Sequence, residues 1–70
     1  MKDKVISIAR DILGSDVKES SSMEDFPRWD SLKTLQIIMA LDESGITVPL
    51  EKIAKIKSIR DIIEFAKQEI

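Results

Sequence analysis

Apolar side chains recur every three or four residues in three stretches of this sequence, and both glycines and both prolines fall between those stretches. This spacing places the apolar side chains of each stretch on one face of an α-helix. Glycine and proline are poor residues for a helix interior, so their positions mark the connections. The pattern therefore predicts an all-α protein of three main helices. A chain of 70 residues forms a single domain, covering residues 1–70.

The first helix is expected over about residues 3–14. Its apolar stripe consists of Val5, Ile8, Ala9, Ile12 and Leu13. Gly14 follows, where a helix often ends in a left-handed glycine. Residues 15–30 carry no helical pattern, and connections of this length are often functional in a small domain. We expect this long first loop to be ordered, because four apolar side chains could anchor it. They are Val17, Met23, Phe26 and Trp29.

A second helix is predicted from Asp30–Ser31 to about Ser44. Asp30 or Ser31 can cap its first turn, and Gly45 ends the pattern. Its apolar residues wrap most of the way round the cylinder, which is typical of a central helix with neighbours on several sides. These residues are Leu32, Leu35, Ile37, Ile38, Met39, Ala40 and Leu41.

The last third of the chain predicts a short helix and a third main helix. Residues 46–49 are extended by pattern, and we expect them to be unpaired because no second strand is evident. One or two helical turns are expected over residues 50–54. Ser58 and Asp61 resemble a capping box with Asp in place of Glu. The helix behind it is predicted to reach the C-terminus, with Ile59, Ile62, Ile63, Ala66 and Ile70 on its apolar face.

The residue types absent from the chain exclude most catalytic chemistry. There is no cysteine and no histidine, which removes disulfides, thiolate chemistry, the commonest general base and the usual zinc ligand. A serine without a neighbouring base is a weak nucleophile, so a serine hydrolase is a poor interpretation. We therefore predict no catalytic residues, no metal site and no enzymatic activity.

Charge and hydropathy narrow the partners and the compartment. The formal net charge of −2 gives no bulk attraction to nucleic acid. The basic cluster of residues 52–60 has no interleaved aromatic side chain for base stacking. The longest apolar run is far too short to span a membrane, and no signal peptide is evident. We expect a cytoplasmic protein that binds neither nucleic acid nor membrane.

Ser31 stands out physically, because it lies at a predicted helix N-terminus after a long loop. Backbone N–H groups and the helix dipole favour a phosphate at that position. A phosphodiester on Ser31 is therefore electrostatically tolerated. The alternative is that Asp30 and Ser31 are only capping residues, as at most helix starts.

Four segments in order resemble the acyl carrier protein family. Asp30–Leu32 matches its D-S-L motif, and residues 35–43 are similar to its second helix. Residues 45–49 resemble the family's G-I-x-I/V-P loop, and residues 55–61 resemble the entry to its last helix. The resemblance covers residues 3–68. D-S-L alone is common, whereas its combination with the two later segments at these distances is specific.

The resemblance implies a four-helix bundle of three main helices, a short third helix and a long first loop. It implies that Ser31, flanked by Asp30 and Leu32, receives 4′-phosphopantetheine from CoA through a phosphopantetheinyl transferase. The thiol of that group would hold an acyl or aminoacyl cargo as a thioester. The implied partners are acyl-loading and acyl-transferring enzymes. The carrier itself is expected to be a monomer.

The resemblance also assigns two sets of surface and interior positions. The partner-docking residues would be Lys33, Gln36, Met39, Ala40, Glu43 and Val48. The acyl pocket would be lined by Leu41, Val48, Ile53, Ile56 and Ile62. In the family, positions 53 and 62 are often alanine. The larger isoleucines predict a smaller pocket, which favours a short or polar cargo or one left exposed to solvent.

Departures from the family's pattern favour a specialised carrier. Lys33 and Gln36 occupy positions that are usually acidic in carriers of fatty acid synthesis, and Trp29 replaces a small residue. We predict a carrier for a dedicated lipid or secondary-metabolite pathway. The cargo stays open between fatty acyl, polyketide, hydroxyacyl and aminoacyl groups. The alternative is a carrier-like module that is never modified and acts by binding a protein partner.

Overall fold

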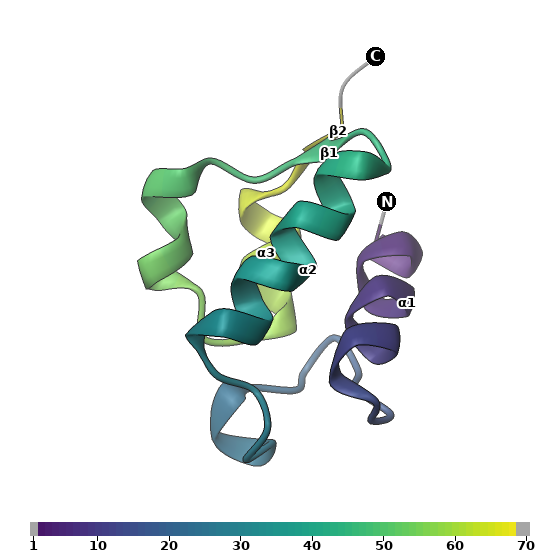
Figure 1. Cartoon of the computed structure of the whole chain (residues 1–70), viewed down its shortest axis with the longest axis vertical. Coiled ribbons are helices and arrows are strands. Elements are labelled where there is room, and N and C mark those ends of the chain that lie inside the picture. Colours follow the sequence, from purple (N-terminus) through teal and green to yellow (C-terminus); the bar gives the residue numbers. More distant parts are fainter. Residues whose placement is uncertain (1, 69–70) are drawn as a thin grey trace.

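The computed structural model describes residues 2–68 of the chain (Figure 1). Its elements are α1 (Lys2–Leu13), the 3₁₀ helix η1 (Met23–Asp25), α2 (Ser31–Glu43), β1 (Ile46–Thr47), the 3₁₀ helix η2 (Leu50–Lys55), α3 (Ile59–Phe65) and β2 (Lys67–Gln68). α1 packs against both α2 and α3, and α2 also contacts β1 and η2. The predicted all-α bundle of three main helices and a short third helix is confirmed. Within residues 2–68, no helix has the length and hydropathy needed to cross a membrane.

The first helix and its loop follow the prediction. Gly14 has a φ of +66°, and its N–H donates to the carbonyl of Arg10 at 2.8 Å. The loop is ordered, with Val17 and Trp29 buried in the core. Its backbone is tied to the entrance of α3. The N–H of Met23 donates to Lys57 O at 2.8 Å, and the N–H of Ile59 donates to Ser21 O at 3.0 Å.

α2 begins and ends at the predicted residues, but the prediction that its apolar residues are covered on several sides is wrong for part of the helix. Thr34, Ile37, Ile38 and Leu41 are buried. Leu32 and Met39, in contrast, are each 60% exposed. Within residues 2–68, α1, β1 and η2 pack against α2 but leave Leu32 and Met39 mostly exposed. One apolar stripe of α2 is therefore left at the surface.

Residues 46–49 were expected to be unpaired, and this prediction is wrong. β1 pairs antiparallel with β2, with Ile46 opposite Gln68 and Thr47 opposite Lys67. The third main helix ends at Phe65 rather than reaching the C-terminus, and Ala66 is extended. The pairing with β2 gives the backbone N–H and C=O groups beside the buried Ile46 hydrogen-bond partners. A continuation of α3 past Phe65 could not supply these partners. Ile70, which was expected on the helix face, lies outside the described residues.

The start of α3 shows a variant of the predicted capping box. Ser58 Oγ accepts a hydrogen bond from the N–H of Asp61 at 3.1 Å. The Asp61 carboxylate accepts from the N–H of Lys57 at 2.9 Å, one residue before the cap. Behind this cap, the buried apolar residues form one core. They are Val5, Ala9, Leu13, Val17, Trp29, Ile37, Ile38, Leu41, Ile46, Val48, Ile56, Ile59, Ile62 and Ala66.

Candidate functional site

Ser31 is the first residue of α2, and it is exposed. Asp30 caps the helix, since its carboxylate oxygen accepts from the N–H of Lys33 at 3.0 Å. Within residues 2–68, the Ser31 hydroxyl takes part in no hydrogen bond. The motif residue Leu32 is exposed beside it. The structure thus presents a free hydroxyl at the N-terminus of a 13-residue helix.

A buried hydrogen-bond network joins residues that precede and follow Ser31 in the sequence. The indole N–H of Trp29 donates to Thr34 Oγ1 at 2.7 Å. Thr34 Oγ1 donates in turn to the carbonyl of Asp30 at 3.2 Å. Thr34 was not among the site residues predicted from the sequence. The available signal was Trp29 itself, because the N–H of a buried tryptophan usually finds a polar partner.

A groove begins at Ser31, and we call it the Ser31 groove. It has a volume of about 420 Å³ and lies between the start of α2, η1 and η2. Its walls are mostly apolar, with one lysine on the rim. The lining residues are Met23, Ser31, Thr34, Leu50, Ile53, Ala54, Ile56 and Lys57. An arm attached to Ser31 would therefore have an apolar surface beside it.

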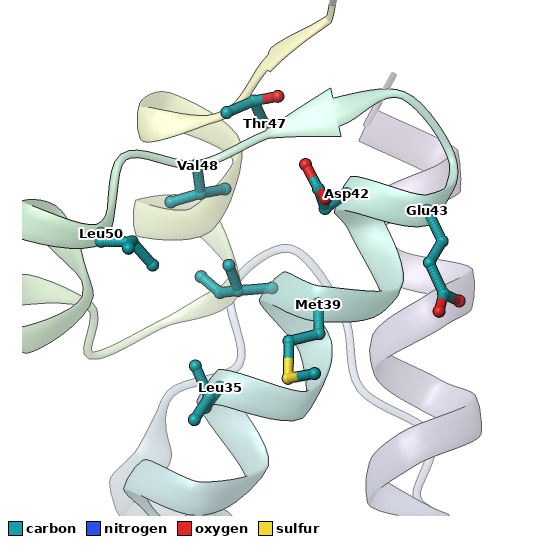
Figure 2. Close-up of a pocket in the computed structure, with 8 residues that line it drawn as sticks. Leu35, Met39, Asp42, Glu43, Thr47, Val48 and Leu50 are labelled. Carbon is teal, nitrogen blue, oxygen red and sulfur yellow. The ribbon is translucent and has the colours of Figure 1, made fainter.

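A second groove, the α2–β1 groove, has a volume of about 390 Å³. Figure 2 shows Leu35 and Met39 along α2, across from Val48 and Leu50, with Glu43 directed away from the opening. The other lining residues are Ile38, Asp42 and Thr47. Leu50 is 75% exposed and belongs to both grooves, so it separates them at the surface.

The structure brings only part of the predicted docking set together. Met39, Glu43 and Val48 line the α2–β1 groove, although Val48 is itself buried. Gln36 is exposed outside that groove. Lys33 and Ala40 are half-buried on another side of α2. Leu35 and Leu50 also line the groove, and the set implied by the family resemblance did not include them.

The five residues predicted to line an acyl pocket are divided among three places. Val48 lies on the α2–β1 groove, whereas Ile53 and Ile56 lie on the Ser31 groove. Leu41 and Ile62 are completely buried in the core and line neither groove. In this structure the five side chains do not line a common groove.

The ion pairs of the structure are remote from Ser31 in the sequence. Lys2 Nζ lies 2.8 Å from Glu19 Oε1, and Arg10 pairs with Asp16 at 3.3 Å. The hydrogen bond and charge of Lys2 lower the pKa of Glu19, and those of Glu19 raise the pKa of Lys2. In the part of the chain that the structure describes, no group of His, Cys, Asp or Glu side chains could hold a metal ion.

Comparisons with known proteins agree with this geometry. The family model for a phosphopantetheine attachment site matches residues 3–66. An acyl carrier protein of Thermosynechococcus vestitus is 36% identical, and the match covers 97% of this chain and 89% of that protein. Acyl carrier proteins of Rickettsia bellii and Rickettsia canadensis are each 33% identical, over 97% of this chain and 84% of theirs. No solved structure gives a significant match.

The residues at the start of α2 fit a covalent phosphopantetheine group. Ser31 offers an exposed hydroxyl, the helix N-terminus favours a phosphodiester, and the Ser31 groove lies alongside. The family match spans nearly the whole chain, and the relatives are similar over almost their full length. The chain therefore belongs to the acyl carrier protein family, whose covalently attached prosthetic group is 4′-phosphopantetheine.

Proposed function

We propose that this chain is a specialised carrier, modified at Ser31, that holds an acyl or aminoacyl group and presents it to partner enzymes. The observation that carries the proposal is the exposed Ser31 hydroxyl at the N-terminus of α2, beside an apolar groove. The chain has no cysteine, and the attached group supplies the thiol for a thioester. The protein would hold and present the cargo, while its partners make and break bonds.

The start of α2 suits the charge of the attached group. The N-terminal N–H groups and the helix dipole stabilise a negative phosphodiester, typically by about 0.3–1 kcal/mol at an exposed site. The Asp30 carboxylate is engaged with the N–H of Lys33. The attachment position is thus compatible with a nearby acidic cap.

Partner enzymes would dock on the exposed side of α2 and the α2–β1 groove. Leu35, Met39 and Leu50 offer apolar contacts there, and Asp42 and Glu43 offer negative charge. Lys33 and Gln36 stand where carriers of fatty acid synthesis are usually acidic. Charge at a docking surface mainly sets encounter rate and partner choice. These two residues support a dedicated pathway with its own loading and transferring enzymes.

The cargo is proposed to be short or polar. Leu41 and Ile62 are completely buried in the core, and Ile53 lines the Ser31 groove. A long acyl chain would need room in that packed interior, and extra methylenes there typically cost about 1–3 kcal/mol. We expect the protein loaded with a long acyl chain to have a melting temperature no higher than that of the protein loaded with a short acyl chain. A clearly higher melting temperature for the long-chain form would contradict a small pocket.

Attachment at Ser31 is tested by mass spectrometry. The purified protein is incubated with CoA and a phosphopantetheinyl transferase of broad specificity, and its intact mass is compared with that of Ser31→Ala. We expect the wild type to gain one phosphopantetheine and the variant to gain none. Ser20→Ala, at the one exposed position of the three loop serines 20–22, is the matched control and should be modified normally. An unmodified wild type, or modification within residues 20–22, would refute the assignment.

A second candidate is an unmodified interaction module, and the exposed apolar stripe of α2 favours it. Leu32 and Met39 could contact a protein partner whether or not Ser31 is modified. The mass of the protein isolated from its own cells distinguishes the two functions. Under either function we propose a cytoplasmic monomer without enzymatic activity. Fractionation of the cells tests the compartment, and the mass measured in solution tests the oligomeric state.

A further inference from the structure

Trp29 precedes Ser31 in the sequence and Thr34 follows it, and a hydrogen bond joins their side chains. Both side chains are almost fully buried, with 3% of Trp29 and 2% of Thr34 exposed. The indole N–H donates to Thr34 Oγ1 at 2.7 Å, a short hydrogen bond. Thr34 Oγ1 then donates to Asp30 O at 3.2 Å. The hydrogen bond between Trp29 and Thr34 joins the end of the long loop to the first turn of α2.

The network fixes Asp30, the residue immediately before Ser31, through both its backbone and its side chain. Its carbonyl accepts from the N–H and from the hydroxyl of Thr34, at 3.0 and 3.2 Å. Its carboxylate accepts from the N–H of Lys33 at 3.0 Å. The N–H of Trp29 donates to Phe26 O at 2.9 Å, which extends the constraint into the loop. Ser31 is thus exposed in its side chain but held in its backbone.

We propose that Trp29 and Thr34 are positioning residues that hold the Ser31 hydroxyl in the orientation required for phosphopantetheine transfer, an inference that rests on the proposed modification of Ser31. In that step Ser31 Oγ bonds to the phosphorus that carries pantetheine. The pyrophosphate bond of CoA breaks, adenosine 3′,5′-bisphosphate leaves, and the hydroxyl proton passes to a base on the transferase. This chain contributes only a nucleophile in a fixed place. A misplacement of about 1 Å can slow such a step by about a hundredfold.

The same network could in principle serve stability alone, and the two roles are separable by kinetics. A purely structural bond slows transfer only to the extent that it unfolds the protein. A positioning bond lowers the rate of transfer in protein that is still folded. It also lowers kcat more than it raises the KM for the carrier, because the transferase still binds the surface of α2.

Four variants address the network. Thr34→Val keeps the shape of the side chain and removes its hydroxyl, whereas Thr34→Ser keeps the hydroxyl. Trp29→Phe keeps an aromatic ring and removes the donor, and a double variant combines Trp29→Phe with Thr34→Val. Two buried core substitutions remote from Ser31 in the sequence, Val5→Ala in α1 and Ile59→Val in α3, are controls that bracket the loss of stability. Transfer from CoA is measured at a temperature at which circular dichroism shows every variant to be folded.

We expect Thr34→Val and Trp29→Phe each to lower kcat by about tenfold. The double variant should be no slower than Thr34→Val, which already removes the indole hydrogen bond that Trp29→Phe removes. Thr34→Ser should transfer within about twofold of the wild type, and so should the two core controls. Normal transfer by folded Thr34→Val would overturn the proposal. An equal loss in a core control of matched melting temperature would also overturn it.

The fluorescence of Trp29 gives an independent measurement, because it is the only tryptophan in the chain. We expect its emission to shift in Thr34→Val and to be restored in Thr34→Ser. An unchanged emission in Thr34→Val would show that the bond is absent in solution and would overturn the proposal. Failure of the wild type to accept phosphopantetheine is a different result, since it refutes the proposed function itself and the positioning role with it.

Discussion

The two sides of α2 differ in what they do for the protein. One side is buried against the rest of the domain and carries Ile37 and Leu41, neither of which is exposed. The other side carries Leu32 and Met39, which are equally apolar and mostly exposed. A small domain needs nearly all its apolar surface for folding. The exposed apolar residues of α2 contribute little to that core, and they are the basis of the docking surface proposed above.

The largest expected effect is on the buried side. Leu41→Ala should lower the free energy of unfolding by about 2–5 kcal/mol, because it leaves a cavity in a fully buried site. Urea denaturation followed by circular dichroism measures the loss. The smaller truncation Ile37→Val should cost about 0.5–1.5 kcal/mol. A Leu41→Ala variant as stable as the wild type would show that the two sides do not differ in stability.

The exposed side should show the opposite behaviour. Met39→Ala should change the free energy of unfolding by no more than about 0.5 kcal/mol, as is usual for surface positions. It should lower kcat/KM for loading by the carrier's own partner enzyme by about tenfold if Met39 is a central contact. Ser7→Ala, exposed on α1 and outside both grooves, is the control and should lose less. Equal losses for both variants would remove the groove from the docking surface.

A charge change along α2 tests partner choice without altering the core. The double variant Lys33→Asp with Gln36→Glu should accelerate turnover by the basic enzymes of general fatty acid synthesis by a few-fold at low salt. The gain should diminish as ionic strength rises, since it depends on electrostatic steering. Initial rates at two salt concentrations measure it. A wild type that already serves those enzymes as well as a general carrier does would contradict a dedicated pathway.

The smallest effect is expected away from α2, at the exposed pair of Lys2 and Glu19. The hydrogen bond and charge of Lys2 hold the pKa of Glu19 below its usual 4.5. A carboxyl with a lowered pKa in the folded state stabilises the fold above 4.5, and this contribution is lost as pH falls through the lowered value. Melting temperatures of the wild type and Glu19→Gln should therefore differ slightly at neutral pH and converge in acid. A difference that grows in acid would contradict the assigned pair.

The pattern of apolar residues predicted the helices well, because each helix buries a stripe with a period that the sequence displays. Gly14 and Gly45 marked the helix ends, and both have positive φ. The pairing of β1 with β2 was missed because strands of two residues carry no readable period. Their partnership depends on a contact between segments about twenty residues apart.

The position of the site along the chain could be predicted from the sequence, whereas the side chains that lie around it could not. The D-S-L motif located Ser31, and the structure places that residue at the exposed start of α2 as expected. Periodicity placed Leu35 on the covered apolar surface of α2, whereas it is 38% exposed and lines the α2–β1 groove. The bond between Trp29 and Thr34 was also missed, because it depends on how the loop enters the helix rather than on either residue alone.

The ties between the first loop and the entrance of α3 have a consequence for the order of events during synthesis. The loop before Ser31 is held by backbone hydrogen bonds to Lys57 and Ile59. The ribosome adds these two residues to the chain well after Ser31. A nascent chain that ends before those residues lacks both of these hydrogen bonds. We therefore expect modification to wait until the last helix has emerged, so that an acceptor hydroxyl is offered only by a carrier that is already complete enough to protect its cargo.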